Sequence, residues 1–160
     1  ISFLKGLFHK VTDNRVNFIN AIAVAEERGI SISHSYSSKK ISYSNLIMAK
    51  VITSSSEYSI GGSVFSEIHP RIVSMMGYSI DVVPKGILLY MKNKDVPGVV
   101  GKIGTLLGTN NINIGSYILS RDSKESSAIS IVRVDEEIKL EIIKEISSLA
   151  EIETVNQLVL

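Results

Sequence analysis

The sequence predicts an α+β protein in which helices cover one face of antiparallel sheets. Two observations support this prediction: several short runs alternate apolar and polar residues, and other stretches repeat apolar residues at helical spacing. A break at Pro84-Lys85-Gly86 leaves halves of similar size, so two small domains are expected, at residues 1–84 and 85–160.

The first domain is expected to combine two helices with several strands. Apolar residues recur at helical spacing from the first position, at Ile1, Leu4, Phe8 and Val11. Since no initiator methionine precedes them, the domain is expected to be incomplete at its N-terminus. A second helix is predicted at 14–28, with Asp13 or Asn14 as its cap and Gly29 as its end. Strands are then predicted at 30–37, 43–53, 58–65, 71–75 and 78–83.

The second domain has the order strand, helix, strand, strand, helix, strand. Its strands are predicted at 87–91, 112–119, 127–134 and 152–160, and its helices at 99–107 and 138–149. The second helix follows Asp135-Glu136-Glu137, whose carboxylates would complement the positive end of a helix dipole. This order predicts a ferredoxin-like sandwich, βαββαβ, with both helices on one face of an antiparallel sheet.

The polar loop between the first strand and first helix of this domain suits a small zwitterion. Asp95 can take an ammonium group, Pro97 suits a first helical turn, and Gly98 lets a carboxylate approach free backbone N–H groups. Asn93 precedes these residues, and Asn113 follows the helix with both donor and acceptor groups. Two simpler interpretations stay open: Asp95 as a helix N-cap and Asn113 as a turn residue.

Glycines at 98, 101, 104 and 108 share one face of the predicted helix. A glycine inside a helix costs roughly 1 kcal/mol relative to alanine, so a bare face suggests close approach of a ligand or a neighbouring backbone. The spacing does not match the G-x-G-x-x-G dinucleotide fingerprint.

The run from Asn93 to Gly108, followed by Asn111-Ile112-Asn113-Ile114, resembles the ACT domain that ends bacterial and plant D-3-phosphoglycerate dehydrogenase. Upstream segments resemble the intervening domain of that enzyme family: residues 4–7, 16–21, 26–30, 61–65, 70–73 and 77–81. The resemblance covers essentially the whole chain, with its motifs in the same order.

The resemblance implies feedback regulation of serine biosynthesis. In that family the ACT domain binds L-serine between two ACT domains of a homo-oligomer, which places Asn93 and Asp95 on one subunit and Asn113 on its partner. The family pattern differs at Val96, where many members have a basic residue, and position 93 also varies. Catalysis and NAD binding would belong to preceding domains, so no catalytic residue, metal or cofactor is expected in this chain.

An anionic effector is a second expectation. Gly61-Gly62 offers flexible backbone, and arginine grips carboxylates and phosphates through paired hydrogen bonds. In some relatives the intervening domain binds a phosphorylated or hydroxy-acid effector, and Arg71 and Arg133 match those positions best. A surface salt bridge for each arginine stays open as the simpler interpretation.

Composition argues against several other classes of partner. The 17 basic and 16 acidic side chains nearly balance, and the central strands offer only Tyr117 where RNA-binding modules stack bases on several aromatics, so no nucleic acid is expected. The sequence contains no long apolar span of the kind that crosses a membrane, and it contains no cysteine. A cytoplasmic location is expected, or a plastid for a plant or alga. Two alternatives stay open: the ACT-bearing part of an L-serine dehydratase, and an oligomerisation module that binds no ligand.

Overall fold

A computed structural model describes residues 1–8, 11, 16–38, 43–121 and 126–160. The chain forms two compact units, residues 1–42 and 43–160, which are taken in turn. None of the helices in the described part of the chain has the length and apolar composition to cross a lipid bilayer.

The first unit holds two short helices, α1 (Ser2–Phe8) and α2 (Ala21–Glu27). They bury a small shared core formed by Leu4, Phe8, Ala21 and Ala25. Before α2, the Asn17 side chain accepts hydrogen bonds from the backbone N–H groups of Ile19 and Asn20. This local competition for the backbone delays the helix, which begins later than predicted. The predicted caps Asp13 and Asn14 lie outside the described residues.

Gly29 ends α2 as predicted, with a positive φ of 69°. The strand predicted at 30–37 is wrong, because these residues are exposed and form no ladder. Their alternation of Ile and Ser imitates a strand, yet Tyr36 is 94% exposed and no described strand pairs with the segment. Alternation alone therefore does not make a strand when no neighbour supplies the hydrogen bonds.

The second unit begins with a four-stranded antiparallel meander. Its strands pair in chain order, β1 (Ile47–Ile52), β2 (Glu57–Phe65), β3 (His69–Met75) and β4 (Tyr78–Val82). Met76 and Gly77 both have positive φ between β3 and β4, as a two-residue hairpin turn requires. The pairing of β2 with β3 shifts between Gly61 and Gly62, which marks a β-bulge.

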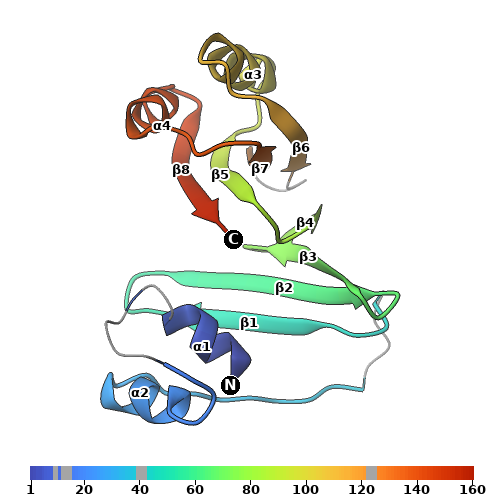
Figure 1. The fold of residues 1–160 in the computed structure, drawn as a ribbon, viewed down its shortest axis with the longest axis vertical. Coiled ribbons are helices and arrows are strands. Elements are labelled where there is room, and N and C mark those ends of the chain that lie inside the picture. The colour runs from blue at the N-terminus through green and yellow to red at the C-terminus, as the bar shows by residue number, and fades with distance from the viewer. Residues whose placement is uncertain (9–10, 12–15, 39–42, 122–125) are drawn as a thin grey trace. The chain divides into compact units, whose positions relative to one another are not determined.

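A second four-stranded sheet follows with the order β6-β7-β5-β8. Its elements are β5 (Ile87–Lys94), α3 (Val99–Thr109), β6 (Ile114–Arg121), β7 (Ser127–Val134), α4 (Leu140–Ser147) and β8 (Ile152–Val159). All three strand pairings are antiparallel, and α3 and α4 lie on the same face of the sheet (Figure 1). The βαββαβ order and the ferredoxin-like arrangement are those that the sequence predicts.

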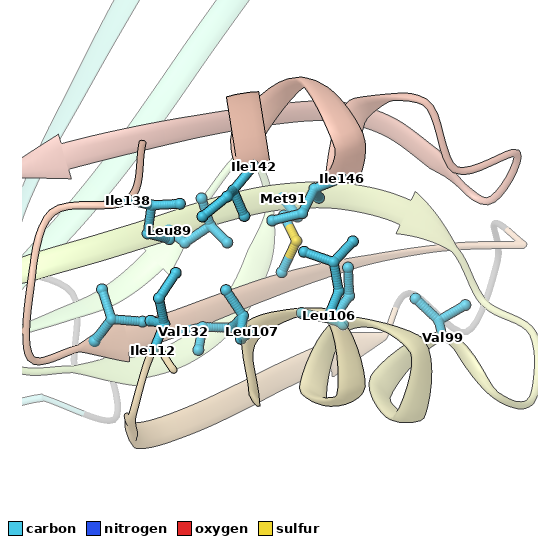
Figure 2. Close-up of a cluster of buried hydrophobic side chains, with 12 residues drawn as sticks. Leu89, Met91, Val99, Leu106, Leu107, Ile112, Val132, Ile138, Ile142 and Ile146 are labelled. Atoms are coloured by element: carbon cyan, nitrogen blue, oxygen red, sulfur yellow. The ribbon is translucent and has the colours of Figure 1, made fainter. Parts of the chain in front are cut away.

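The core of this fold lies between the sheet and its two helices. Figure 2 shows Leu89 and Met91 of β5 pointing toward Leu106 and Leu107 of α3, with Ile146 of α4 beside them. Leu89, Met91 and Leu107 are completely buried, because Ile87, Leu89 and Met91 alternate along β5 and one stripe of α3 is apolar.

The start of α4 differs from the prediction. The helix begins at Leu140 after Lys139, so the acidic run 135–137 lies in the loop before it and does not form its first turn. Ile138 explains the delay: its side chain is 4% exposed, and its backbone N–H donates to Gln157 Oε1 at 2.7 Å. This anchoring holds residue 138 in the core as part of the loop.

Strand β4 covers the face of the second sheet that lies opposite the helices. Tyr78, Ile80 and Val82 form one buried cluster with Leu88, Ile129 and Ile131. The Tyr78 hydroxyl also hydrogen-bonds the Ser127 hydroxyl at 2.7 Å. The middle of this sheet is therefore apolar on both faces, which explains why β7 is buried at seven of its eight positions.

Candidate functional site

The loop between β5 and α3 is held by backbone hydrogen bonds to two neighbouring segments. The N–H of Lys94 donates to the Glu151 carbonyl, and the N–H of Asp95 donates to the Ser126 carbonyl, both at 2.8 Å. Gly98 then takes a left-handed conformation, with φ of 92°, as the N-cap of α3. These constraints fix where the Asp95 side chain leaves the loop.

Asp95 does not cap the helix, so the simpler interpretation of this residue is wrong. The N-cap is Gly98, and no side chain of the described residues bonds to the cap. Instead Asp95 Oδ2 accepts a hydrogen bond from Arg121 Nε at 2.7 Å, which joins the loop to the end of β6. The Asp95 side chain is 21% exposed and that of Arg121 is 67% exposed, so water reaches this ion pair.

An open pocket of about 260 Å³ lies beside this ion pair. Asp95, Pro97 and Gly98, three of the predicted site residues, line it together. The other lining residues are Val96, Val99, Val100, Leu119 and Arg121. The pocket therefore combines one carboxylate and one guanidinium with mostly apolar walls, at a size below that of drug-sized ligand pockets.

Arg121 was not among the predicted site residues, although the sequence carries a signal for its position. Arg121 shares the strand parity of Tyr117 and Leu119, and Tyr117 packs against the core on the helix side of the sheet. The alternation of β6 therefore places Arg121 on the side from which α3 begins.

Asn93 lies beneath the loop and does not line the pocket. Its side chain is 2% exposed, and its amide nitrogen donates to the Lys94 carbonyl at 2.8 Å. Its carbonyl oxygen accepts from the Ser130 hydroxyl at 3.0 Å, and Ser130 accepts from the Tyr117 hydroxyl. Burial raises the pKa of Tyr117 above its ordinary value of 10, although the bond to Ser130 lowers it in part. Asn93 is thus placed to support the loop from below.

Asn113 lies at the opposite end of α3 from Asp95. Its amide nitrogen donates to Asp135 Oδ2 at 2.7 Å. Because α3 has 11 residues and a helix rises 1.5 Å per residue, its ends lie about 16 Å apart. One copy of the chain therefore does not bring Asn113 to Asp95.

The glycine face of α3 is open in this chain. A methyl group at Gly101, Gly104 or Gly108 would meet no described atom within 4 Å beyond the backbone of α3 itself. No close approach within the described part of the chain accounts for these glycines.

The structure brings Arg71 of β3 and Arg133 of β7 to one pocket of about 200 Å³. Arg71 Nε lies 3.1 Å from Asp81 Oδ1. The Arg133 guanidinium lies against Gly115, where a Cβ would meet Arg133 Nε at 3.2 Å. Asp81 also lines the pocket, and the remaining lining residues are Val82, Val83, Leu88, Ser116, Ile118 and Ile131.

Gly61 and Gly62 do not line this pocket. They lie at the bulge in β2, where a Cβ on Gly61 would approach the Met48 sulfur to 2.6 Å. The Gly61 position is thus accounted for by packing within the first sheet.

Comparison with known proteins gives two matching family models. The model described as the D-3-phosphoglycerate dehydrogenase intervening domain matches residues 1–76, and the ACT domain model matches residues 87–151. The D-3-phosphoglycerate dehydrogenase of Bacillus subtilis is 35% identical over 154 residues, covering 96% of this chain and 29% of that protein. That of Archaeoglobus fulgidus is 34% identical over 150 residues, covering 92% and 28%. The chain thus spans less than a third of the length of these curated relatives.

Proposed function

The chain belongs to two domain families, the D-3-phosphoglycerate dehydrogenase intervening domain and the ACT domain, and we propose that it is the regulatory region of such a dehydrogenase. The proposed ligand is a small amino acid, with L-serine as the first candidate, and the proposed outcome is feedback inhibition of serine biosynthesis. NAD binding and oxidoreductase chemistry would belong to parts of the parent enzyme outside this chain. The proposed setting is a cytoplasmic homo-oligomer.

The observation that carries the ligand proposal is the pocket beside Asp95. The Asp95 carboxylate faces a small, largely apolar volume at the start of α3. An ammonium group there can replace Arg121 as the partner of this carboxylate. A charge-assisted hydrogen bond from an ammonium group to a carboxylate is stronger than a neutral one. The pocket therefore suits a compact amino acid.

A second copy of the chain completes the proposed site. Asn113 cannot reach Asp95 of its own chain, but the corresponding side chain of a partner can do so if the two domains pair beside their α3 helices. Among the described strands, β6 lies at an edge of its sheet and pairs only with β7, so its outer backbone groups could pair with another chain. The open glycine face of α3 would also permit close approach of the partner.

Regulation follows from this arrangement by linkage. An amino acid that contacts both copies binds the paired state more tightly than the separated one, so it raises the population of the pair. A parent enzyme whose activity depends on the orientation of its ACT domains would respond by the same coupling free energy.

Isothermal titration of L-serine into the chain tests the proposal, with D-serine and glycine as controls. We expect saturable heat that favours L-serine and disappears in Asp95→Ala. Glu136→Gln is the matched control, because it removes an exposed carboxylate from a loop that does not line the pocket, and it should leave the heat unchanged. No heat from the unmodified chain would instead favour an oligomerisation module that binds no ligand.

A second candidate function is binding of a carboxylate or phosphate effector between Arg71 and Arg133. The supporting observation is that both guanidinium groups line one pocket although they come from different sheets. Asp81 already pairs with Arg71, so an anion must compete with it or use the remaining donors of both arginines.

Titration with inorganic phosphate tests this second site. Arg133→Gln should abolish phosphate binding and leave the L-serine affinity within twofold of the unmodified chain, because Arg133 does not line the pocket beside Asp95. Unchanged phosphate binding in Arg133→Gln would remove the assignment.

A further inference from the structure

Arg121 is the one cationic side chain that lines the pocket beside Asp95 in the described structure. Its Nε donates to Asp95 Oδ2 at 2.7 Å, and no other contact with an acidic side chain is present among the described residues. A guanidinium carries five N–H donors in a fixed plane, so one contact through Nε leaves the terminal nitrogens available. The arginine is therefore only partly engaged by the chain itself.

We propose that Arg121 is a ligand-binding residue of this pocket, which holds Asp95 when the pocket is empty and takes the α-carboxylate of the amino acid when it is filled. This inference rests on the proposed function and deepens it, because it names the group that recognises the carboxylate end of the ligand. The ammonium group of the ligand takes the place that Arg121 Nε occupies at Asp95.

The charge balance of the pocket supports this exchange. The negative charge of Asp95 and the positive charge of Arg121 balance each other, and the walls contributed by Val96, Val100 and Leu119 are apolar. A zwitterion that inserts between the two side chains gives each of them a new opposite charge. A ligand with only an ammonium group pairs with Asp95 alone, and a ligand with only a carboxylate pairs with Arg121 alone, so only a zwitterion makes both charge-assisted contacts.

The exposure of the two side chains makes the exchange feasible. Arg121 is 67% exposed, so its long side chain can turn away from Asp95 without opening the core. Exposed ion pairs contribute little to stability, so the ligand need not overcome a strong internal contact. Asp95 is less exposed and is anchored through its backbone, so the carboxylate stays in place while the arginine moves.

The inference predicts selection for a free carboxylate as well as for an amine. The unmodified chain should bind L-serine at least tenfold more tightly than L-serine methyl ester, which keeps the ammonium group but has no carboxylate. Arg121→Gln should weaken L-serine binding at least tenfold and reduce the preference over the ester to less than threefold. Arg121→Lys should retain part of the preference, because it keeps the charge but loses the planar pair of donors.

Isothermal titration of both ligands into the chain and its variants decides the matter, with circular dichroism to confirm folding. Lys50→Gln is the control, since Lys50 is an exposed, ion-paired cation in the first sheet and should leave both affinities unchanged. If the unmodified chain binds neither ligand, the proposed function fails and this inference falls with it. If the unmodified chain binds L-serine and Arg121→Gln keeps both the affinity and the preference over the ester, the inference alone is overturned.

Discussion

The buried hydrogen bond between Asn93 and Ser130 should be detectable as an energetic coupling between the two side chains. Ser130 is 0% exposed and Asn93 is 2% exposed, and the Ser130 hydroxyl donates to Asn93 Oδ1 at 3.0 Å. Replacing Asn93 by Leu leaves a buried hydroxyl proton without its acceptor, and replacing Ser130 by Ala leaves a buried carbonyl without its donor. Each single change should therefore cost about 1–3 kcal/mol.

The double variant Asn93→Leu/Ser130→Ala should cost less than the sum of the single changes. With both partners gone, neither leaves an unsatisfied group on the other, so we expect a coupling free energy of about 1–3 kcal/mol. The neighbouring contacts to Tyr117 and to the Lys94 carbonyl are lost in the single variants too, and they cancel in the cycle only if they are independent.

Residue-level amide hydrogen exchange in β5 and β7 is the appropriate assay, because the chain forms two compact units and a single denaturation midpoint would mix them. Thr154→Val, an exposed change on β8 of the same sheet, is the control and should stay within about 0.5 kcal/mol of the unmodified chain. Additive effects of the two single changes, within about 0.5 kcal/mol, would refute the reasoning.

Four further outcomes follow from the same geometry. Met91→Ala should lower the free energy of unfolding by about 2–5 kcal/mol, measured by residue-level amide exchange in the second unit, because Met91 is completely buried, whereas Met48→Ala at a 55% exposed position should cost less than about 1 kcal/mol. Gly98→Ala should cost roughly 1 kcal/mol, measured the same way, because the φ of 92° strains any side chain. Gly104→Ala should stabilise the isolated chain by about 0.5–1 kcal/mol while weakening self-association in sedimentation velocity; unchanged association would show that no partner covers that face. The raised pKa of Tyr117 means that the folded chain holds the phenol proton to higher pH than the unfolded chain does. The contribution of the neutral phenol to folding stability is therefore complete below pH 10 and is lost as pH rises through the folded pKa. Tyr117→Phe should accordingly lose stability less steeply at alkaline pH, as followed by circular dichroism.

The order of elements in the second half of the chain was predictable because local periodicity and core burial agree there. Leu89 and Met91 alternate along β5, and Ile103 and Leu107 follow the helical repeat of α3. The segment 30–37 shows the opposite case, where alternation without a partner strand misled the prediction. The start of α4 could not be located because it depends on a hydrogen bond that the Ile138 N–H donates to Gln157, 19 residues further along the chain.

The candidate sites could be predicted only in part, because some of their residues are also placed by contacts between distant segments of the chain. Asp95, Pro97 and Gly98 are neighbours in sequence, so a loop motif identified them together. The burial of Asn93 depends on pairing with β7, and the position of Arg121 depends on where β6 ends relative to that loop. Both facts arise from strand register between distant segments, which a single sequence does not specify.

The stretch between the two segments matched by family models contains a packed strand, β4. The family models cover residues 1–76 and 87–151, so Tyr78–Val82 falls in the gap where a tether of variable length would be expected. Its burial alternates strictly, with residues 78, 80 and 82 inward and residues 79 and 81 outward. Inserting one residue within the strand would reverse the alternation on one side of the insertion, so apolar side chains there would turn away from Leu88 and Ile131 of the second sheet. A change of length that an ordinary interdomain connector would tolerate should therefore destabilise the second sheet when it falls within β4.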